Sequence, residues 1–194
     1  MSMEGSGSAV DLSWIPLGAG ASVPIVTWNG RLFERVAARR RHEPPRDLYH
    51  AALEVYLDGD RHAIEMAPAW GPGSGGGGVV ATGPVGLRWL GRSRFFRYEV
   101  RCSRGGVIPD LGWAVGGARR VTEDPVAVRR LLGLVPQVPV ATWGRDELRT
   151  GDMWNSNSLV AWLLARSGAD LRRTTLPEGG RAPGWDAGLI VAAR

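Results

Sequence analysis

Residues 48–67 have the sequence LYHAALEVYLDGDRHAIEMA, and this stretch decides the fold. Apolar and polar residues alternate on either side of Asp58-Gly59, a pair that is typical of two-residue turns between antiparallel strands. A two-residue turn at this point places Leu53 opposite Ile64. The stretch therefore predicts a β-hairpin.

The register of this hairpin divides its side chains between two faces. The face toward the core is expected to carry Ala51, Leu53, Val55, His62, Ile64 and Met66. His50, Glu54 and Glu65 are expected on the opposite face, with Glu65 diagonal to His50. A carboxylate in that place is near enough to orient an imidazole ring.

The segments around the hairpin supply further strands and helices. Strands are predicted at residues 95–102, 138–143 and 188–192. Helices are predicted after the caps Asn29 and Asp124, and over residues 156–166 up to the stop at Gly168. We therefore expect an α+β fold, in which an antiparallel sheet packs against helices.

The length of 194 residues suits one domain with its own core. Residues 1–22 are mostly small and polar and are interpreted as a flexible N-terminal arm, which leaves residues 23–194 as the single domain. Residues 70–78, WGPGSGGGG, predict a mobile loop. This loop is either a lid over a site or a tolerated surface insertion.

The single cysteine, Cys102, excludes an intramolecular disulfide and a cysteine-rich metal cluster. Its place in an alternating strand predicts a buried thiol that is not a nucleophile. His50 and His62 point to opposite faces of the hairpin, so we expect no metal, and no cofactor motif is present. The N-terminus lacks a signal sequence and no segment predicts a membrane span, which favours a cytoplasmic protein.

The net charge is +5, and all 24 basic residues are arginines. Clusters at residues 39–41 and 88–104 suggest phosphate binding as one possibility. We interpret them as solvated faces, because no RNA-binding signature accompanies them, and expect no specific nucleic-acid partner. The sequence does not predict the oligomeric state.

The most enzyme-like pattern combines His50 with Trp154-Asn155-Ser156-Asn157-Ser158 at the start of the apolar helix. This order resembles the circularly permuted NlpC-like, papain-like superfamily, which includes lecithin:retinol acyltransferase-like and PPPDE-like proteins. Its members carry a histidine on an early strand and a nucleophilic cysteine at a later helix start, in a run such as Asn-Cys-x-x-Phe-Ala. Asn155-Ser156 falls on Asn-Cys, so that a serine stands in place of the cysteine.

The resemblance implies a papain-like fold over roughly residues 45–170 and an active site at this helix. Ser156 would be the nucleophile and His50 its general base, with Glu65 orienting the ring. Asn155 or Asn157 would stabilise the oxyanion, and Ser158 is an alternative hydroxyl. Asn155 and Ser156 are also ideal helix caps, and that structural interpretation stays open.

The resemblance predicts a hydrolase or acyltransferase that acts on an amide or ester bond of a small-molecule or peptide substrate. The alternative is a catalytically inactive domain that keeps the cleft to bind a ligand or a protein, and nucleic-acid binding is a third hypothesis. A second cluster precedes the helix and contains Trp143, Arg145, Asp146 and Trp154. It forms either a ligand-binding wall or a loop held by an Arg–Asp pair.

Overall fold

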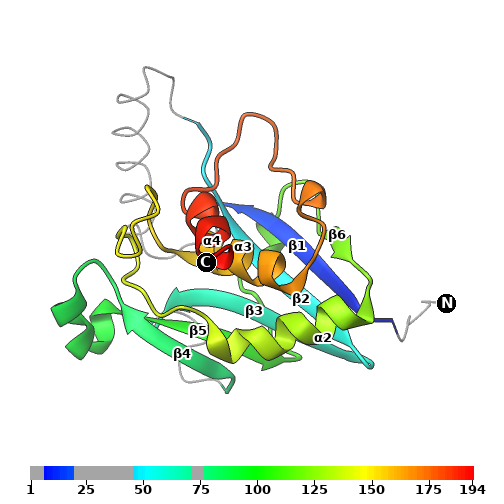
Figure 1. The fold of residues 1–194 in the computed structure, drawn as a ribbon, viewed down its shortest axis with the longest axis horizontal. Helices are drawn as coiled ribbons and strands as arrows, with labels where there is room; N and C mark the ends of the chain where they lie inside the picture. Colours follow the sequence, from blue (N-terminus) through cyan, green and yellow to red (C-terminus); the bar gives the residue numbers. More distant parts are fainter. Residues whose placement is uncertain (1–6, 20–45, 71–76) are drawn as a thin grey trace.

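The computed structural model describes residues 7–19, 46–70 and 77–194. Within these ranges the chain forms a six-stranded antiparallel sheet with the order β4-β5-β3-β2-β1-β6. The strands are β1 (Ala9–Pro16), β2 (Tyr49–Leu57), β3 (Asp60–Pro68), β4 (Val79–Pro84), β5 (Arg97–Arg104) and β6 (Arg119–Thr122). Figure 1 shows β1, β2 and β3 in the middle of the sheet.

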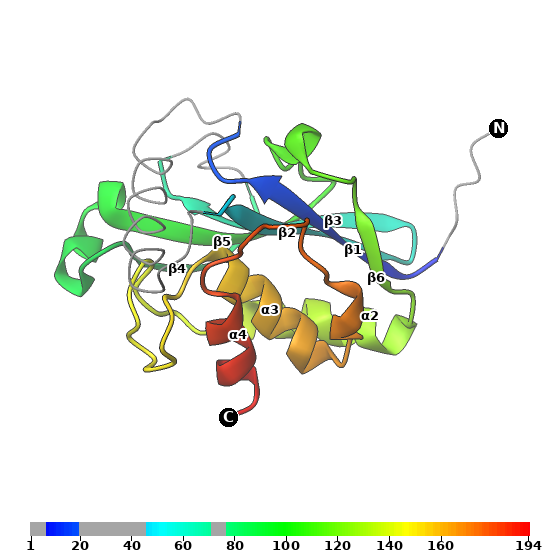
Figure 2. The same cartoon turned by 90° about the horizontal axis from the view of Figure 1, so that it is seen from above.

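Three helices cover one face of the sheet, as the view in Figure 2 shows. They are α2 (Pro125–Leu134), α3 (Ser156–Ser167) and α4 (Trp185–Ala192). The main hydrophobic core lies between these helices and the sheet. The short turns outside the helices are η1 (Arg88–Arg92), η2 (Arg94–Phe96), η3 (Leu111–Trp113), η4 (Val135–Gln137) and η5 (Leu171–Arg173).

A smaller apolar cluster lies on the opposite face of the sheet. It joins Ile15, Ala52 and Ala63 to Ile108 of the segment 105–118, which also contains η3. Among the described residues, the sheet therefore has a large core under the helices and a smaller apolar cluster on its other side. This arrangement confirms the α+β fold class.

The central hairpin has the predicted register, with Leu53 paired to Ile64 and Val55 to His62. Asp58 and Gly59 both have positive φ values, 51° and 85°, as a two-residue type I′ turn requires. Every residue expected on the core face is buried except His62, which is half-buried. The local pattern was therefore sufficient to define the two faces.

The prediction of a flexible N-terminal arm is wrong over residues 9–16, because this segment forms strand β1. β1 pairs with β2 along its whole length and with β6 on its other side. Leu12, Trp14 and Ile15 are fully buried, and the Trp14 indole donates a hydrogen bond to the Thr175 carbonyl at 3.1 Å. The single domain thus begins before residue 23, since its sheet needs this strand.

Two of the smaller predicted strands are also wrong. Residues 138–143 form no strand and contribute only isolated bridges at Trp143. Residues 188–192 belong to α4. The strand was predicted because a short apolar run is compatible with a buried strand as well as with a buried helix. The strand predicted at 95–102 begins at Arg97 instead, and Phe95 and Phe96 lie in η2.

The capped helices are as predicted. The Asp124 carboxylate accepts a hydrogen bond from the Val126 N–H at 2.9 Å, and Pro125 occupies the first position of α2. α3 ends at Gly168, whose φ of 84° is the left-handed conformation expected of a C-cap glycine. The helix predicted after Asn29, and most of the glycine-rich loop, lie outside the described residues.

Cys102 on β5 packs against the main core but is half-buried, so the prediction of a fully buried thiol is only partly correct. Burial raises the pKa of the thiol, which disfavours the reactive thiolate. Among the described helices, none combines the length and the apolar character that crossing a bilayer requires.

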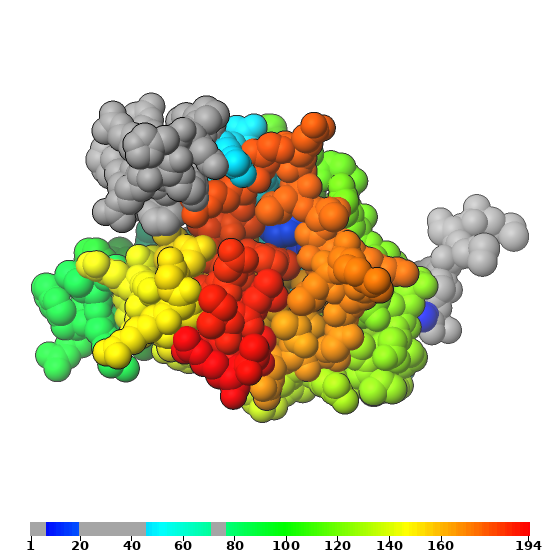
Figure 3. All heavy atoms as spheres, turned by 45° about the horizontal axis from the view of Figure 1, so that its top comes forward, coloured from blue at the N-terminus to red at the C-terminus, as the bar shows by residue number. Residues whose placement is uncertain are grey.

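α4 packs closely against α3 through a glycine. Figure 3 shows α4 on the surface, between the loop that precedes α3 and α3 itself. A Cβ atom at Gly188 would collide with the Ser158 carbonyl and lie 2.8 Å from the Ala161 Cβ. The two helix backbones therefore approach to a distance that only glycine permits.

We expect Gly188→Ala to lower the free energy of unfolding by about 1–3 kcal/mol, because α4 must move away from α3. Urea denaturation measures the change. Gly133→Ala in α2 is the matched control, since nothing lies within 4 Å of its added Cβ. The control should gain roughly 0.5–1 kcal/mol from helix propensity. Equal stability of Gly188→Ala and wild type would contradict the close packing.

Candidate functional site

Strands β2 and β3 separate at one end of the hairpin. Their ladder covers only residues 53–57 and 60–64. Beyond it, β2 continues to pair with β1 as far as Tyr49, and β3 continues to pair with β5 as far as Pro68. Within the described residues, the β3-facing edge of β2 therefore has no strand beside His50, and only an isolated bridge to Arg181 continues it.

The start of α3 occupies this gap through the side chain of Asn157. Its Oδ1 accepts a hydrogen bond from the Ala51 N–H at 2.7 Å, and its Nδ2 donates to the Tyr49 carbonyl at 3.0 Å. Nδ2 also donates to the Pro183 carbonyl at 2.9 Å. The amide thus substitutes for a neighbouring strand, and it bonds the two peptide groups that flank His50.

Asn155 and Ser158 complete a buried cap at the same place. Asn155 Oδ1 accepts from the Asn157 and Ser158 N–H groups at 2.9 and 3.2 Å, and its Nδ2 donates to Pro183 at 2.8 Å. Ser158 Oγ accepts from the Asn155 N–H at 3.0 Å and donates to the Gly184 carbonyl at 2.7 Å. The side-chain amides proposed as oxyanion donors, and the alternative hydroxyl, are therefore structural.

Ser156 differs from its neighbours. It is the first residue of α3 and only 9% exposed. Among the described residues, neither its hydroxyl nor its N–H has a hydrogen-bond partner. All fully enclosed polar side-chain atoms of these residues have partners, so the Ser156 hydroxyl must reach solvent.

His50 has a carboxylate partner that the sequence analysis did not identify. Its Nε2 lies 2.8 Å from Oδ2 of Asp110, in the segment that covers the second face of the sheet. Burial alone would raise the pKa of Asp110, but the hydrogen bond and charge of His50 outweigh it and hold that pKa below its ordinary value. Asp110 is therefore an anionic partner for the ring.

Glu65, which was expected to orient His50, is an ion-pair partner of Arg101 instead. Arg101 Nη1 lies 3.5 Å from Glu65, and the same guanidinium bonds Glu99 through Nε and Nη2 at 2.9 and 2.7 Å. Burial raises the pKa of Glu65, with Arg101 opposing the shift, Asp110 adding to it and His50 opposing it. Glu65 thus belongs to the surroundings of the His50–Asp110 pair without bonding the ring.

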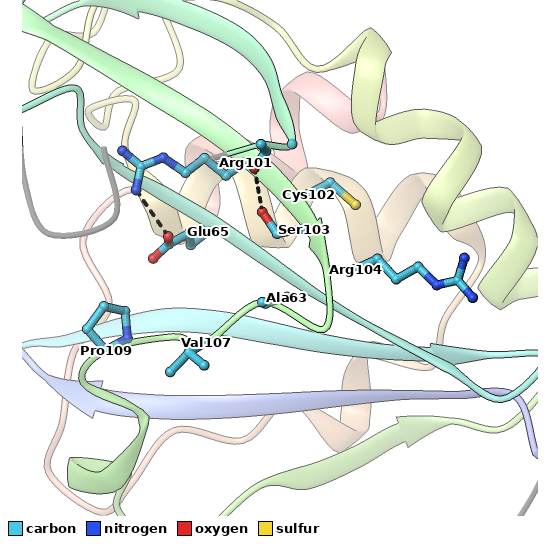
Figure 4. Close-up of a pocket in the computed structure, with 11 residues that line it drawn as sticks. Ala63, Glu65, Arg101, Cys102, Ser103, Arg104, Val107 and Pro109 are labelled. Carbon is cyan, nitrogen blue, oxygen red and sulfur yellow. Dashed lines mark hydrogen bonds and ion pairs between the residues drawn. The ribbon is translucent and has the colours of Figure 1, made fainter. Parts of the chain in front are cut away.

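A cavity of about 470 Å³ lies beside this cluster. Figure 4 shows Glu65 and Arg101 in its lining, with Ser103 and the loop residues Val107 and Pro109. Pro109 precedes Asp110, so the cavity extends along the segment that carries the histidine's partner. Its volume is in the range of small-molecule sites. Ser156 is not among the lining residues.

The structure does not bring His50 and Ser156 together on one face of the sheet, as a shared active site would require. His50 pairs across the sheet with Ile15 of the second apolar cluster, whereas α3 packs on the main core. Asn157, next to Ser156, nevertheless bonds the peptide groups on both sides of His50. No hydrogen bond joins the His50 ring to the Ser156 hydroxyl within the described part of the chain.

The second predicted cluster is a loop held by side-chain bonds, but not by the expected Arg–Asp pair. Trp154 is buried in the core, and Trp143 packs edge-on against Tyr98 with ring centroids 5.8 Å apart. Arg145 donates to the Gly86 carbonyl at 2.6 Å, while Asp146 accepts from the N–H groups of residues 150 and 151. The loop is held by side-chain bonds to backbone, and no open tryptophan wall results.

Comparison with known proteins adds no relative. No family model matches the sequence, and neither the curated proteins nor the solved structures gave a match. In the three described ranges, no group of at least three His, Cys, Asp or Glu side chains is arranged to hold a metal ion. Function is therefore inferred from the geometry around His50.

We expect Asn157→Ala to lower the free energy of unfolding by about 2–5 kcal/mol, because two buried peptide groups of β2 lose their partner. Ser156→Ala is the matched neighbour and should stay within about 0.5 kcal/mol of wild type. Thermal and urea unfolding of both variants give the comparison. Similar losses in the two variants would show that the Asn157 amide does not hold this junction.

Proposed function

We propose that this protein is a hydrolase or acyltransferase that acts on an amide or ester bond, with Ser156 as nucleophile and His50 as general base. Asp110 takes the orienting role that the sequence analysis gave to Glu65. The observation that carries the proposal is the hydrogen bond of 2.8 Å between His50 and Asp110. The papain-like, permuted NlpC-like architecture is part of the same proposal.

The carboxylate supports the histidine in two ways. A carboxylate on Nε2 fixes the orientation of the ring and stabilises the imidazolium that forms when the ring takes a proton. It also leaves Nδ1, which has no partner among the described residues, as the nitrogen for proton transfer. A general base held in this way is what a serine needs, because its hydroxyl ionises far above neutral pH.

The start of α3 supports Ser156 as the nucleophile. A helix N-terminus favours negative charge, and the Ser156 N–H is a free donor for an oxyanion at the attacked carbonyl. The three polar neighbours of Ser156 are engaged in the cap, so they hold the helix start in place. This fixed frame leaves one hydroxyl available for chemistry.

The reaction follows from these roles. His50 accepts the Ser156 proton as Oγ attacks the carbonyl carbon, and it then donates that proton to the leaving alcohol or amine. The acyl group remains on Oγ until water or a second alcohol or amine takes it, with His50 again moving the proton. Water as acceptor gives hydrolysis, and another nucleophile gives acyl transfer.

A second candidate is a catalytically inactive papain-like domain that binds a ligand. Two observations favour it: His50 and Ser156 are not hydrogen-bonded, and the cavity beside Glu65 and Arg101 does not include Ser156. A binding domain would use that cavity and would need no reactive serine. The two functions differ in whether Ser156 forms a covalent bond.

We expect a fluorophosphonate probe to label the wild-type protein on Ser156. Mass spectrometry of the labelled peptides would identify the modified residue. Ser156→Ala should abolish labelling, and His50→Ala should slow it by at least about 100-fold, because the base is lost. Asp110→Asn should slow labelling far more than Glu65→Gln. Ser93→Ala, at an exposed serine, is the control. Absence of wild-type labelling would favour the binding function.

Ser156→Cys provides a second test in a Cys102→Ala background. A thiol at the start of α3 that pairs with His50 should have a depressed pKa and react with iodoacetamide at neutral pH. Ser156→Cys/His50→Ala should lose this advantage. A pH profile centred near the free thiol value of about 8.5, and unaffected by His50, would show that the two residues do not form a catalytic pair.

A further inference from the structure

The chain between β4 and β5 exposes a set of aromatic and basic side chains that the site does not use. Trp89 is 68% exposed and Phe95 is 69% exposed. Both belong to the short turns η1 and η2, which project at the end of the molecule next to β4 and β5 in Figures 1 and 2. The aromatic–arginine patch consists of Leu87, Arg88, Trp89, Arg92, Arg94, Phe95, Phe96 and Arg97.

The patch is strongly basic as well as apolar. Residues 79–97 contain four arginines and no aspartate or glutamate. Arg88 reaches Glu147 at 3.3 Å but stays 84% exposed, so this contact removes little of its charge from the surface. Arg92, Arg94 and Arg97 are also exposed.

A cluster of exposed large apolar side chains lowers the solubility of a protein, and such a cluster is typical of an interaction site. Short projecting turns with exposed rings are suited to insertion between lipid headgroups. Tryptophan and phenylalanine bind at the boundary between headgroups and hydrocarbon, and arginines around them pair with lipid phosphates and anionic headgroups.

We propose that the aromatic–arginine patch docks this protein on membrane surfaces that contain anionic lipids. The charge of the patch complements such a surface, and the exposed rings supply the apolar contact. Single-stranded nucleic acid is the other polyanion to consider. It prefers a basic groove in which successive bases stack on aromatic side chains, whereas these rings are carried on projecting turns.

The test is co-sedimentation of the full chain with vesicles of phosphatidylcholine alone or of phosphatidylcholine with phosphatidylserine. We expect binding to the anionic vesicles that weakens as salt rises. Arg92→Gln/Arg94→Gln should reduce affinity by about 25-fold, since each arginine near the surface contributes roughly fivefold. Trp89→Ala/Phe95→Ala should reduce it by at least about tenfold.

Matched controls come from exposed residues elsewhere in the chain. Trp113→Ala removes a tryptophan that is 61% exposed on η3, and Arg172→Gln/Arg173→Gln removes two exposed arginines. Both should bind the vesicles as wild type does. Equal losses in the controls, no binding to anionic vesicles, or tight binding to single-stranded RNA with none to vesicles would each overturn the proposal.

Discussion

The amide of Asn157 is the contact on which the arrangement of this protein depends. It supplies a donor to the Tyr49 carbonyl and an acceptor to the Ala51 N–H, and it joins the sheet to α3 and to the segment before α4. Unpaired peptide groups inside a protein are costly, so the gap between β2 and β3 requires a partner of this kind. The same contact brings the helix start beside the strand that carries His50.

The polar residues at this junction are of two kinds. Some form hydrogen bonds that stabilise the fold, and others have side-chain atoms without such bonds. Asn155, Asn157 and Ser158 all form buried hydrogen bonds, although in the sequence their amides and hydroxyl suggested catalytic roles. In the described structure, Ser156 differs from these three neighbours because its hydroxyl has no hydrogen-bond partner. On the other side of the sheet, Asp110 holds His50, and Arg101 holds Glu65. Most polar side chains of this region are therefore engaged in bonds that stabilise the fold.

The sequence predicted the parts of the fold that depend on near neighbours in the chain. Asp58-Gly59 and the alternation around it determine the hairpin register, and Asp124, Asn155 and Gly168 mark helix ends by local bonding. The central strand β1 was missed because its partners are far along the chain. Its short apolar run is preceded by small polar residues, and only pairing with β2 and β6 makes it a strand.

The site was predicted in part for the same reason. His50 and Glu65 were correctly assigned to one face, because strand periodicity fixes the side of each residue. The partner of His50 could not be found in this way, since Asp110 lies in an irregular segment and is 60 positions away. Likewise, residues 188–192 suit either a strand or a helix, and the contact of Gly188 with α3 decides for the helix.

The bonds of Asn157 also impose an order on biosynthesis. They connect positions separated by 108 residues on one side and by 26 on the other. During translation the histidine strand leaves the ribosome long before α3, and the cap is complete only when Pro183 and Gly184 have followed. Contacts of such long range form late and slow the folding of a chain. The start of α3 is therefore joined to the strand that carries His50 only near the end of synthesis.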